Sequence, residues 1–467
     1  MDFHDRTLEL AQLERTWSQT GPQLITLWGR RRVGKTTLLT RFAEGRRGLY
    51  FYGTRATEAD ILRGFSHQAA ELLQQEYLRE APFRSWEVAL QHLVRNLGHE
   101  PWVLVLDEFP YLCEVTAGLD TLVQKWWDTL PTGTAPVVVL AGSGFSFMEG
   151  LVGARGPLHG RRTAQVEVRP FDYLDAAHFF PDLQAADRVR AYACFGGSPA
   201  HLRFFQKGRS LAENVVERLL SPEHFLFREG EELLRTEFHK EALYASILRA
   251  VANGEHRPSD IARAVGRSSA DQIFDHLKRL QDLDFLRREV PVTELGRARS
   301  QRVLYKLSDP YLRFWFTYVA PFQSVLQLGR GRSLWEQEIF PHFDEFVART
   351  TWEEVCQQFL WREVGLNRLP TRVANLGRWW DAHQEIDVVG MWRSEVTLVG
   401  ECKWSNATMG SRELNQLQEK AAALPLAKEP CWCLFSRSGF SPELRLRAGR
   451  DSQLLLIEPK ELFKASG

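Results

Sequence analysis

Apolar positions in the first third of the chain form short uninterrupted runs that alternate with longer segments of helical spacing. Such runs are typical of strands that are buried on both faces of a parallel sheet. The runs lie at residues 24–28, 49–52, 102–106, 137–141 and 166–168. Their alternation with helical segments predicts an α/β domain, with a parallel sheet covered by helices on both faces.

A different pattern extends from about residue 235 to residue 322. Helical segments lie at residues 242–252, 260–265 and 269–283, and strand-like runs follow at 285–290 and 302–307. Gly296 lies between the two runs and marks a turn. This order predicts a winged helix-turn-helix, in which residues 269–283 form the recognition helix and the two runs form the wing.

The charge of this winged segment is mild. From residue 257 to residue 306 it contains eleven Lys or Arg and seven Asp or Glu, a net of four positive charges. Contact with DNA needs several well-placed cations, and Asp271 and Asp275 of the recognition helix would oppose a DNA backbone. The segment is therefore predicted either to contact DNA or to serve as a spacer or a protein-docking module.

Two further strand-like runs, at residues 385–390 and 396–403, predict a hairpin in which charged residues stand among apolar ones. Glu401 and Lys403 are two positions apart and therefore point to one face of their strand, and Asp387 of the neighbouring strand can join them. Two carboxylates that converge on one point repel each other unless a hard cation lies between them. Asp387 and Glu401 therefore predict a Mg²⁺ or Mn²⁺ site, where Lys403 would hold or activate the water that attacks a phosphodiester.

Length and composition limit the alternatives. The 467 residues leave room for two to four domains, and a hydrophobic share of 44% suffices for packed cores. The formal net charge is zero, so any surface that binds nucleic acid must be local. Six scattered cysteines predict reduced, buried thiols. Because the sequence contains no leader segment and no apolar run of membrane-spanning length, we expect a cytoplasmic protein without a membrane partner.

The turn after the first strand-like run carries a phosphate-binding motif. Residues 29–36 read Gly-Arg-Arg-Arg-Val-Gly-Lys-Thr, which matches G-x-x-x-x-G-K-[ST], and a helix-like run begins at Thr37. Gly29 and Gly34 let backbone N–H groups surround a triphosphate, to which the helix adds its positive end. Lys35 would reach the β and γ oxygens, and Thr36 would offer its hydroxyl to Mg²⁺. Thr37 belongs to the same expected nucleotide contacts.

The third run supplies the second half of a nucleotide site. It ends in Asp107 and Glu108, a Walker B pattern. Asp107 would hold Mg²⁺ through water, and Glu108 would orient and deprotonate the attacking water. Ser143 follows the fourth run and would either sense the γ-phosphate or form part of a glycine-rich turn. One run lies between the two motifs, which favours an ATPase whose P-loop and Walker B strands are not neighbours.

Six segments, in order, resemble the archaeal and bacterial ATPases of the signal-transduction (STAND) branch of AAA+-like proteins. They are Phe-His-Asp-Arg at residues 3–6, the phosphate-binding loop, Leu-Val-Leu-Asp-Glu-Phe-Pro-Tyr-Leu at 104–112, Ala-Gly-Ser-Gly-Phe-Ser-Phe-Met at 141–148, Pro-Leu-His-Gly-Arg at 157–161 and Phe-Gly-Gly-Ser-Pro at 195–199. Residues 308–316 resemble the signature that leads into the C-terminal domain of the same family. The resemblance implies ATP rather than GTP as the nucleotide.

The resemblance also implies roles for single residues. Phe3 and Arg6 would lie beside the adenine. Arg161 would act as a sensor or, in trans, as an arginine finger, and Arg162 is equally well placed for this role. A finger that acts in trans requires a nucleotide-dependent homo-oligomer.

The acidic hairpin resembles the active site of the PD-(D/E)XK nuclease superfamily, and the C-terminal domain of the ATPase family is similar to its members. Ile386 stands where the motif has a proline, which is a frequent departure in the superfamily. The resemblance further implies an acidic residue on the first helix of the domain. Glu353 matches this position, and Glu354 is the alternative.

Pattern and resemblance together predict five segments. They are a P-loop ATPase core (1–185), a helical lid (186–234), the winged helix-turn-helix (235–322), a helical linker (323–350) and an α/β, restriction-endonuclease-like domain with the PD-(D/E)XK site (351–467). In the lid, the resemblance implies that Gly197 and Pro199 report the nucleotide state.

The expected function is ATP hydrolysis that controls a Mg²⁺-dependent nuclease-like domain acting on nucleic acid, DNA rather than RNA. Two alternatives stay open. The first is an ATP-driven switch or scaffold whose C-terminal domain is catalytically inactive and only binds nucleic acid or protein. The second is a transcriptional regulator that acts through the winged helix.

Overall fold

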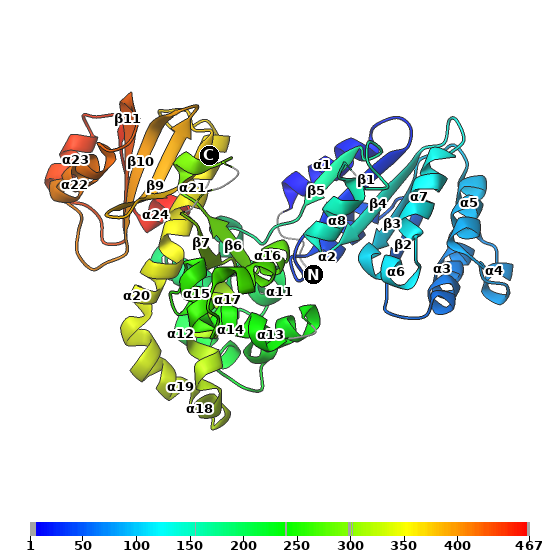
Figure 1. The fold of residues 1–467 in the computed structure, drawn as a ribbon, viewed down its shortest axis with the longest axis horizontal. Coiled ribbons are helices and arrows are strands. Elements are labelled where there is room, and N and C mark those ends of the chain that lie inside the picture. Colours follow the sequence, from blue (N-terminus) through cyan, green and yellow to red (C-terminus); the bar gives the residue numbers. More distant parts are fainter. Residues whose placement is uncertain (1–5, 155, 239–240, 298–299, 301, 465–467) are drawn as a thin grey trace. The chain divides into compact units, whose positions relative to one another are not determined.

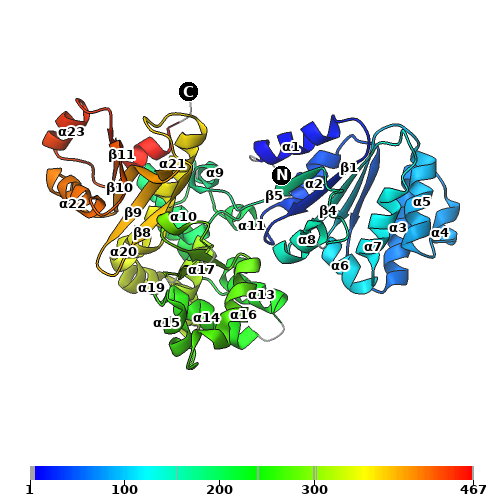
Figure 2. The same ribbon diagram turned by 45° about the horizontal axis from the view of Figure 1, so that its top comes forward.

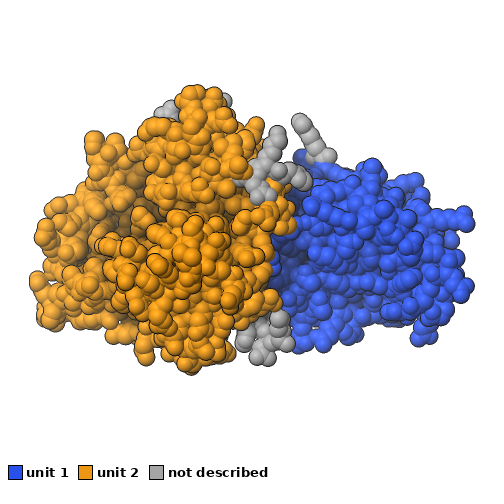
Figure 3. Space-filling view, turned by 90° about the horizontal axis from the view of Figure 1, so that it is seen from below, with its two compact units in different colours: residues 1–170 blue, residues 171–467 orange. Residues whose placement is uncertain are grey.

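The computed structural model describes residues 6–154, 156–238, 241–297, 300 and 302–464. The chain divides into two compact units, residues 1–170 and 171–467, which Figure 3 colours separately. The five predicted segments divide the chain more finely than these units and remain a prediction.

The first unit is built on a sheet of five parallel strands in the order β2-β3-β4-β1-β5 (Figure 1). The strands are β1 (Gln23–Trp28), β2 (Gly48–Tyr52), β3 (Trp102–Asp107), β4 (Pro136–Gly142) and β5 (Ala164–Glu167). The helices are α1 (Thr7–Trp17), α2 (Lys35–Ala43), α3 (Glu58–Leu73), α4 (Tyr77–Glu80), α5 (Trp86–Leu97), α6 (Phe109–Val115), α7 (Leu119–Asp128) and α8 (Phe145–Val152). The predicted α/β fold with a parallel sheet is confirmed. The edge strand β5 begins two residues before its predicted run, because its alternating burial leaves polar positions that an apolar run does not include.

Helices cover both faces of this sheet. On one face, Leu13 of α1 and Phe42 of α2 pack against valines of β3 and β4. On the other face, Phe65 of α3, Trp86 of α5 and Val123 of α7 pack against the alternate residues of the same strands. Every residue of β1, β3 and β4 is buried. Burial of each large apolar side chain contributes about 1.5–3 kcal/mol, so the centre of the sheet is firmly held.

Strand β4 lies between the P-loop strand β1 and the Walker B strand β3. The two motif-bearing strands are therefore not neighbours, as predicted. In the sequence, β4 comes after both β1 and β3. Strand β2 comes between β1 and β3 in the sequence, but in the sheet it forms the edge, beside β3. Because all the strands are parallel, the segments after β1, β3 and β4 meet at the same edge of the sheet.

The second unit begins with a helical region and a two-stranded antiparallel ribbon. The helices before the ribbon are α9 (Tyr173–Ala176), α10 (Ala185–Phe195), α11 (Pro199–Leu202), α12 (Leu211–Arg218), α13 (Phe225–Glu237), α14 (Glu241–Ala252), α15 (Pro258–Ala264) and α16 (Phe274–Asp282). The ribbon pairs β6 (Leu286–Glu289) with β7 (Leu304–Leu307). The helices after it are α17 (Pro310–Phe314), α18 (Gln323–Gln327), α19 (Gly331–Leu334), α20 (Phe343–Val347) and α21 (Glu353–Gly365).

The same unit ends in a mixed five-stranded sheet in the order β12-β11-β10-β9-β8. The strands are β8 (Asn375–Trp380), β9 (Glu385–Trp392), β10 (Glu395–Lys403), β11 (Leu426–Ser436) and β12 (Leu454–Ile457), and the helices are α22 (Ser411–Ala421), α23 (Pro442–Ala448) and α24 (Pro459–Leu462). β8, β9 and β10 are antiparallel neighbours, while β10, β11 and β12 run parallel. Helix α21 packs on one face of the sheet, and α22 and α23 pack on the other (Figure 2). The predicted hairpin is β9–β10, so a C-terminal α/β domain is present.

Within the part of the chain that the structure describes, no helix combines the length and the hydropathy needed to cross a membrane.

Candidate functional site

The P-loop folds closely around its lysine between β1 and α2. Gly29 leaves no room for a side chain, because a Cβ there would lie 2.1 Å from the carbonyl oxygen of Val168. Gly34 has a φ of 92°, a left-handed conformation that favours glycine. The Lys35 ammonium donates to the carbonyl oxygens of Gly29, at 2.8 Å, and Arg30, at 3.2 Å. The loop is thus already shaped around the group that is predicted to meet phosphate.

The two predicted nucleotide motifs meet at Asp107. The hydroxyl of Thr36, in the first turn of α2, donates to Asp107 Oδ2 at 2.8 Å. The backbone N–H of Glu108 donates to Asp107 Oδ1 at 2.9 Å. Asp107 is almost completely buried, while Thr36 and Thr37 are exposed. A threonine hydroxyl beside a Walker B aspartate is the arrangement that holds Mg²⁺ in P-loop NTPases.

Glu108 and Ser143 come together beside this pair. Glu108 lies between β3 and α6 with a φ of 52°, a left-handed conformation that is uncommon for residues other than glycine. Such strained positions cluster at functional sites. The Ser143 hydroxyl donates to Glu108 Oε2 at 3.5 Å. The predicted general base and the predicted phosphate sensor are therefore neighbours.

Tyr50 is a further member of the site that the sequence motifs do not include. Its hydroxyl donates to Asp107 Oδ2 at 2.5 Å. Tyr50 lies on β2, where its Cα partner on β3 is Val105. In the sequence, Tyr50 is a polar aromatic residue within an apolar run, but this run alone does not indicate which strand lies next to it.

Arg6 contacts the P-loop from the segment before α1. Its guanidinium donates to the carbonyl oxygen of Val33 at 2.6 Å and to Glu9 at 3.0 Å. This places one of the two predicted adenine neighbours against the loop. The other, Phe3, lies outside the described residues.

The two predicted arginine-finger positions have partners within the first unit. Arg161 forms a two-pronged ion pair with Asp128, with N–O distances of 2.6 and 2.7 Å. The hydrogen bond from Arg161 lowers the pKa of Asp128. Arg162 donates to Gln165. The role of either arginine toward a nucleotide remains a prediction.

The predicted lid residues Gly197 and Pro199 belong to the second unit. The backbone N–H of Phe171 donates to the carbonyl oxygen of Gly197 at 2.8 Å. A Cβ on Gly197 would lie 1.8 Å from the carbonyl oxygen of Phe171, so the close approach requires glycine. Pro199 is the first residue of α11, a position that suits its fixed φ. Their role as nucleotide sensors remains a prediction.

A second group of ionisable side chains lies on β9, β10 and α22. Asp387 Oδ2 accepts a hydrogen bond of 2.8 Å from the backbone N–H of Cys402. The adjacent Glu401 is held by two lysines: Lys403 Nζ lies 2.5 Å from its Oε1, and Lys420 Nζ of α22 lies 3.5 Å from its Oε2. Asp387 and Glu401 are buried, while Lys403 is half exposed. The structure thus brings the three predicted residues together and adds Lys420, which the strand pattern could not reveal.

Burial and negative charge perturb this acidic site. Burial, followed by the charges of Glu353 and Glu401, raises the pKa of Asp387 to about 7. Glu401 Oε2 is buried and accepts no hydrogen bond from any described residue. Both observations fit a divalent cation with oxygen ligands, which would offset the repulsion. The described residues contain no group of three or more His, Cys, Asp or Glu side chains placed for a metal ion.

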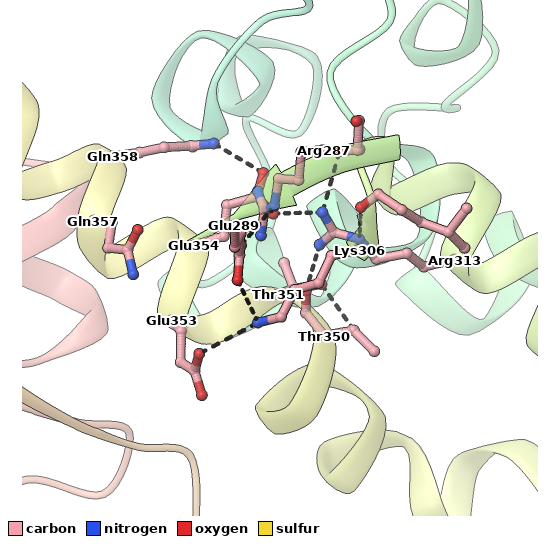
Figure 4. Close-up of polar contacts among 12 residues, drawn as sticks. Arg287, Glu289, Lys306, Arg313, Thr350, Thr351, Glu353, Glu354, Gln357 and Gln358 are labelled. Carbon is pink, nitrogen blue, oxygen red and sulfur yellow. Dashed lines mark hydrogen bonds and ion pairs between the residues drawn. The ribbon is translucent and has the colours of Figure 1, made fainter. Parts of the chain in front are cut away.

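Glu353 and Glu354, the two predicted acidic positions of α21, enter a network of charged residues (Figure 4). Glu354 pairs with Arg313 of α17 at 2.6 Å and with Arg287 of β6 at 2.9 Å. Burial alone would raise the pKa of Glu354, but the two arginines outweigh it and lower the pKa. Glu354 therefore connects α21 to the ribbon and to α17.

Glu353 is held by a different pair of cations. Its Oε2 lies 3.0 Å from Arg378 of β8 and 3.8 Å from Lys306 of β7. The same cations lie 3.7 and 3.5 Å from Glu289 of β6. Burial would raise the pKa of Glu289, but the surrounding positive charges hold it at about 2. Glu353 thus lies near enough to Asp387 to raise the pKa of Asp387, yet it forms ion pairs with cations from β7 and β8.

Two parts of the chain match known families. Residues 3–205 match the model of an ATPase domain found predominantly in Archaea. The chain carries an archaeal-type ATPase domain. Residues 315–419, which extend from the helices after the ribbon into α22, match a family described as archaeal and bacterial proteins of unknown function. This archaeal-type ATPase domain and the C-terminal domain occur together in the order that the motifs predict.

The chain is also similar to individual proteins and solved structures. An uncharacterized protein of Methanocaldococcus jannaschii is 27% identical over 407 residues, which cover 86% of this chain and 88% of that protein. The solved structure of a Walker-type ATPase from Pyrococcus abyssi has a TM-score of 0.50 and 21% identity, and the match covers 68% of this chain and 96% of that chain. This likeness shows the P-loop ATPase fold. A STAND protein with a tetratricopeptide repeat sensor from Pyrococcus horikoshii aligns at 13% identity and a TM-score of 0.31, over 78% of this chain and 50% of its own, a score that supports no conclusion.

Proposed function

We propose that the first unit hydrolyses ATP and that its nucleotide state controls a Mg²⁺-dependent nuclease-like site in the C-terminal domain, which acts on nucleic acid, DNA rather than RNA. The observation that carries the first half is the 2.8 Å hydrogen bond between Thr36 and Asp107. It joins the motif that binds phosphate to the motif that holds the metal.

In this proposal the triphosphate binds at the N-terminus of α2. Lys35 exchanges the loop carbonyl oxygens for phosphate oxygens, which are stronger acceptors because they are charged. Thr36 and Asp107 hold Mg²⁺, Asp107 through water. Glu108 accepts the proton of the attacking water, and Ser143 senses the γ-phosphate.

The remaining residues of the first site surround the nucleotide. We assign Phe3 and Arg6 to the neighbourhood of the adenine, and the hydrogen bond from Arg6 to the P-loop supports the assignment of Arg6. Arg161 or Arg162 completes the site across a nucleotide-dependent homo-oligomer. To act in trans, Arg161 must first break its ion pair with Asp128. The free-energy cost of this step is that of one exposed ion pair.

In the C-terminal domain, Asp387 and Glu401 hold Mg²⁺ or Mn²⁺. The raised pKa of Asp387 supports a cation there, which would share Glu401 with the ammonium groups of Lys403 and Lys420. Burial would lower the pKa of Lys403, but its hydrogen bond to Glu401, together with the negative charges of Glu401 and Asp387, outweighs burial and raises the pKa. A permanently charged lysine suits a group that binds a phosphodiester and orients the attacking water.

The helices α14, α15 and α16 and the ribbon β6–β7 have the order of a winged helix-turn-helix, and we infer that this segment contacts nucleic acid or a protein. Asp271, Asp275, Lys278 and Arg279 are all exposed in or beside α16. This mixture of charges supports docking to a protein or a weak contact with DNA more than tight, salt-dependent DNA binding.

One observation favours a second candidate, an ATP-driven switch or scaffold whose C-terminal domain only binds nucleic acid or protein. Glu353, the acidic residue expected to help the nuclease site, is engaged by Arg378 and Lys306. If these pairs persist, Glu353 cannot contribute to the nuclease-like site.

The first half of the proposal is tested by Glu108→Gln in the full chain. Removing the general base is expected to lower ATP turnover by about 100-fold or more, while ATP affinity stays within a few-fold, because the phosphate contacts remain. Glu87→Gln, at an exposed position of α5, is the matched control. Unchanged turnover in Glu108→Gln would remove Glu108 from the mechanism, and wild type without turnover would refute hydrolysis itself.

A further inference from the structure

Asp107 is held by donors from α2, from β2 and from the residue that follows it in the chain. Oδ2 accepts the Thr36 hydroxyl of α2 at 2.8 Å and the Tyr50 hydroxyl of β2 at 2.5 Å, and Oδ1 accepts the backbone N–H of Glu108 at 2.9 Å. A carboxylate has about four acceptor positions. Three donors therefore leave room for one more, which a metal-bound water can fill.

The place of Tyr50 in the sheet explains how it reaches Asp107. In the parallel pair β2–β3, Tyr50 is the Cα partner of Val105 and Tyr52 is the partner of Asp107. Positions 105 and 107 point to the same face of β3, because side chains alternate along a strand. The Tyr50 ring packs against the apolar cluster of that face, and its hydroxyl extends along β3 to the aspartate.

We propose that Tyr50 is a positioning residue for the magnesium site, which fixes the orientation of the Asp107 carboxylate and thereby sets its affinity for Mg²⁺. This inference rests on the proposed ATPase function, since it assigns Asp107 to the metal.

Tyr50 differs in kind from Thr36. A threonine hydroxyl can donate its proton to Asp107 and offer a lone pair to Mg²⁺ at the same time, so it serves as a ligand. In the proposed site Tyr50 is a ligand of neither the metal nor the phosphate, and it acts through the carboxylate of Asp107. Its loss should therefore lower the affinity for Mg²⁺ and leave metal-free nucleotide contacts intact.

The test is Tyr50→Phe in the full chain, which keeps the packed ring and removes one donor. Binding of a fluorescent ADP analogue is measured in Mg²⁺ titrations and without Mg²⁺, together with ATP hydrolysis. A hydrogen bond to a charged group is worth about a factor of ten or more, so the half-saturating Mg²⁺ concentration is expected to rise about tenfold, with metal-free binding within about twofold of wild type. Tyr77→Phe is the matched control, because Tyr77 is exposed and its hydroxyl donates to Gln75.

An unchanged Mg²⁺ titration in Tyr50→Phe would overturn the proposal, even if hydrolysis fell, because the loss would then be structural. A wild type that binds the ADP analogue with Mg²⁺ dependence but does not hydrolyse ATP would refute only the proposed hydrolysis, and Tyr50 would still be judged by the titration. A wild type whose binding ignores Mg²⁺ would refute the role of Asp107 and of Tyr50 together.

Discussion

At the scale of single residues, the two sites surround a buried aspartate with different neighbours. Asp107 is surrounded by donors from α2, from β2 and from the residue after its own strand. Asp387 accepts a hydrogen bond from the backbone of Cys402 but faces the negative charges of Glu353 and Glu401. Hydrogen bonds to a carboxylate favour its charged form, whereas burial and like charges disfavour it. Asp387 therefore needs a cation, or a proton in its place.

The raised pKa of Asp387 predicts a pH effect on stability. The ordinary pKa of an aspartate is about 3.9, while burial and the neighbouring acids raise that of Asp387 to about 7. Between these two values the folded chain keeps a proton that the unfolded chain has released. The free energy of unfolding of this domain should therefore fall as the pH rises from about 4 to about 7.

The measurement is chemical denaturation from pH 4.5 to pH 8, without divalent cations, of wild type and Asp387→Asn. The wild type should lose stability over this range relative to the variant, by a few kcal/mol at most. Asp271→Asn, at an exposed position, is the control. Parallel pH curves for wild type and Asp387→Asn would show that this carboxyl ionises normally.

At the scale of elements, local patterns reveal strands and motifs but not their partners. The buried strands of the first unit are recognisable because each is an apolar run of its own, and the P-loop is recognisable because its residues are contiguous. Helix α21 is different. Two adjacent glutamates fit its expected acidic position, and only the long-range partners distinguish them: Arg313 and Arg287 hold Glu354, whereas Arg378 and Lys306 hold Glu353.

The network around α21 predicts a large effect of Glu354→Ala. The substitution would leave the guanidinium groups of Arg287 and Arg313 without their shared carboxylate in a buried place. Breaking a buried ion pair by removal of one partner costs about 3–5 kcal/mol. Thermal and chemical unfolding of the full chain should show this loss in the transition of the second unit.

The matched control is Glu363→Ala on the same helix, whose ion pair with Arg368 spans 3.9 Å. A weak pair of this kind contributes at most about 1 kcal/mol. Equal effects of Glu354→Ala and Glu363→Ala would mean that the buried network does not hold α21 to the ribbon.

At the scale of the whole molecule, the order of motifs along the sequence predicted an ATPase domain followed by an α/β domain with a hairpin of charged residues. The path of the chain through the first sheet was only partly predictable, since β4 separates β1 from β3 although β2 lies between them in sequence. Hydrogen bonds between distant strands leave no local trace in the sequence. For the same reason, Tyr50 and Lys420 joined their sites only in the folded chain.

The central claim is that nucleotide in the first unit controls a metal-dependent site in the second. Such control requires two states of the protein that differ in affinity for ATP. Substitutions of Lys35 and Lys403 test the two proposed activities separately, because each lysine is assigned to one site only.

The most direct test is cleavage of plasmid and single-stranded DNA by the full chain with Mg²⁺ or Mn²⁺, with and without ATP. Lys35→Ala and Lys403→Ala are compared with wild type, and Lys428→Ala, at an exposed position of β11, is the control. We predict that wild type cuts DNA, that Lys403→Ala does not, and that Lys35→Ala no longer responds to ATP. Hydrolysis of ATP by wild type without any cleavage of DNA would contradict the account and leave a nucleotide-driven scaffold in its place.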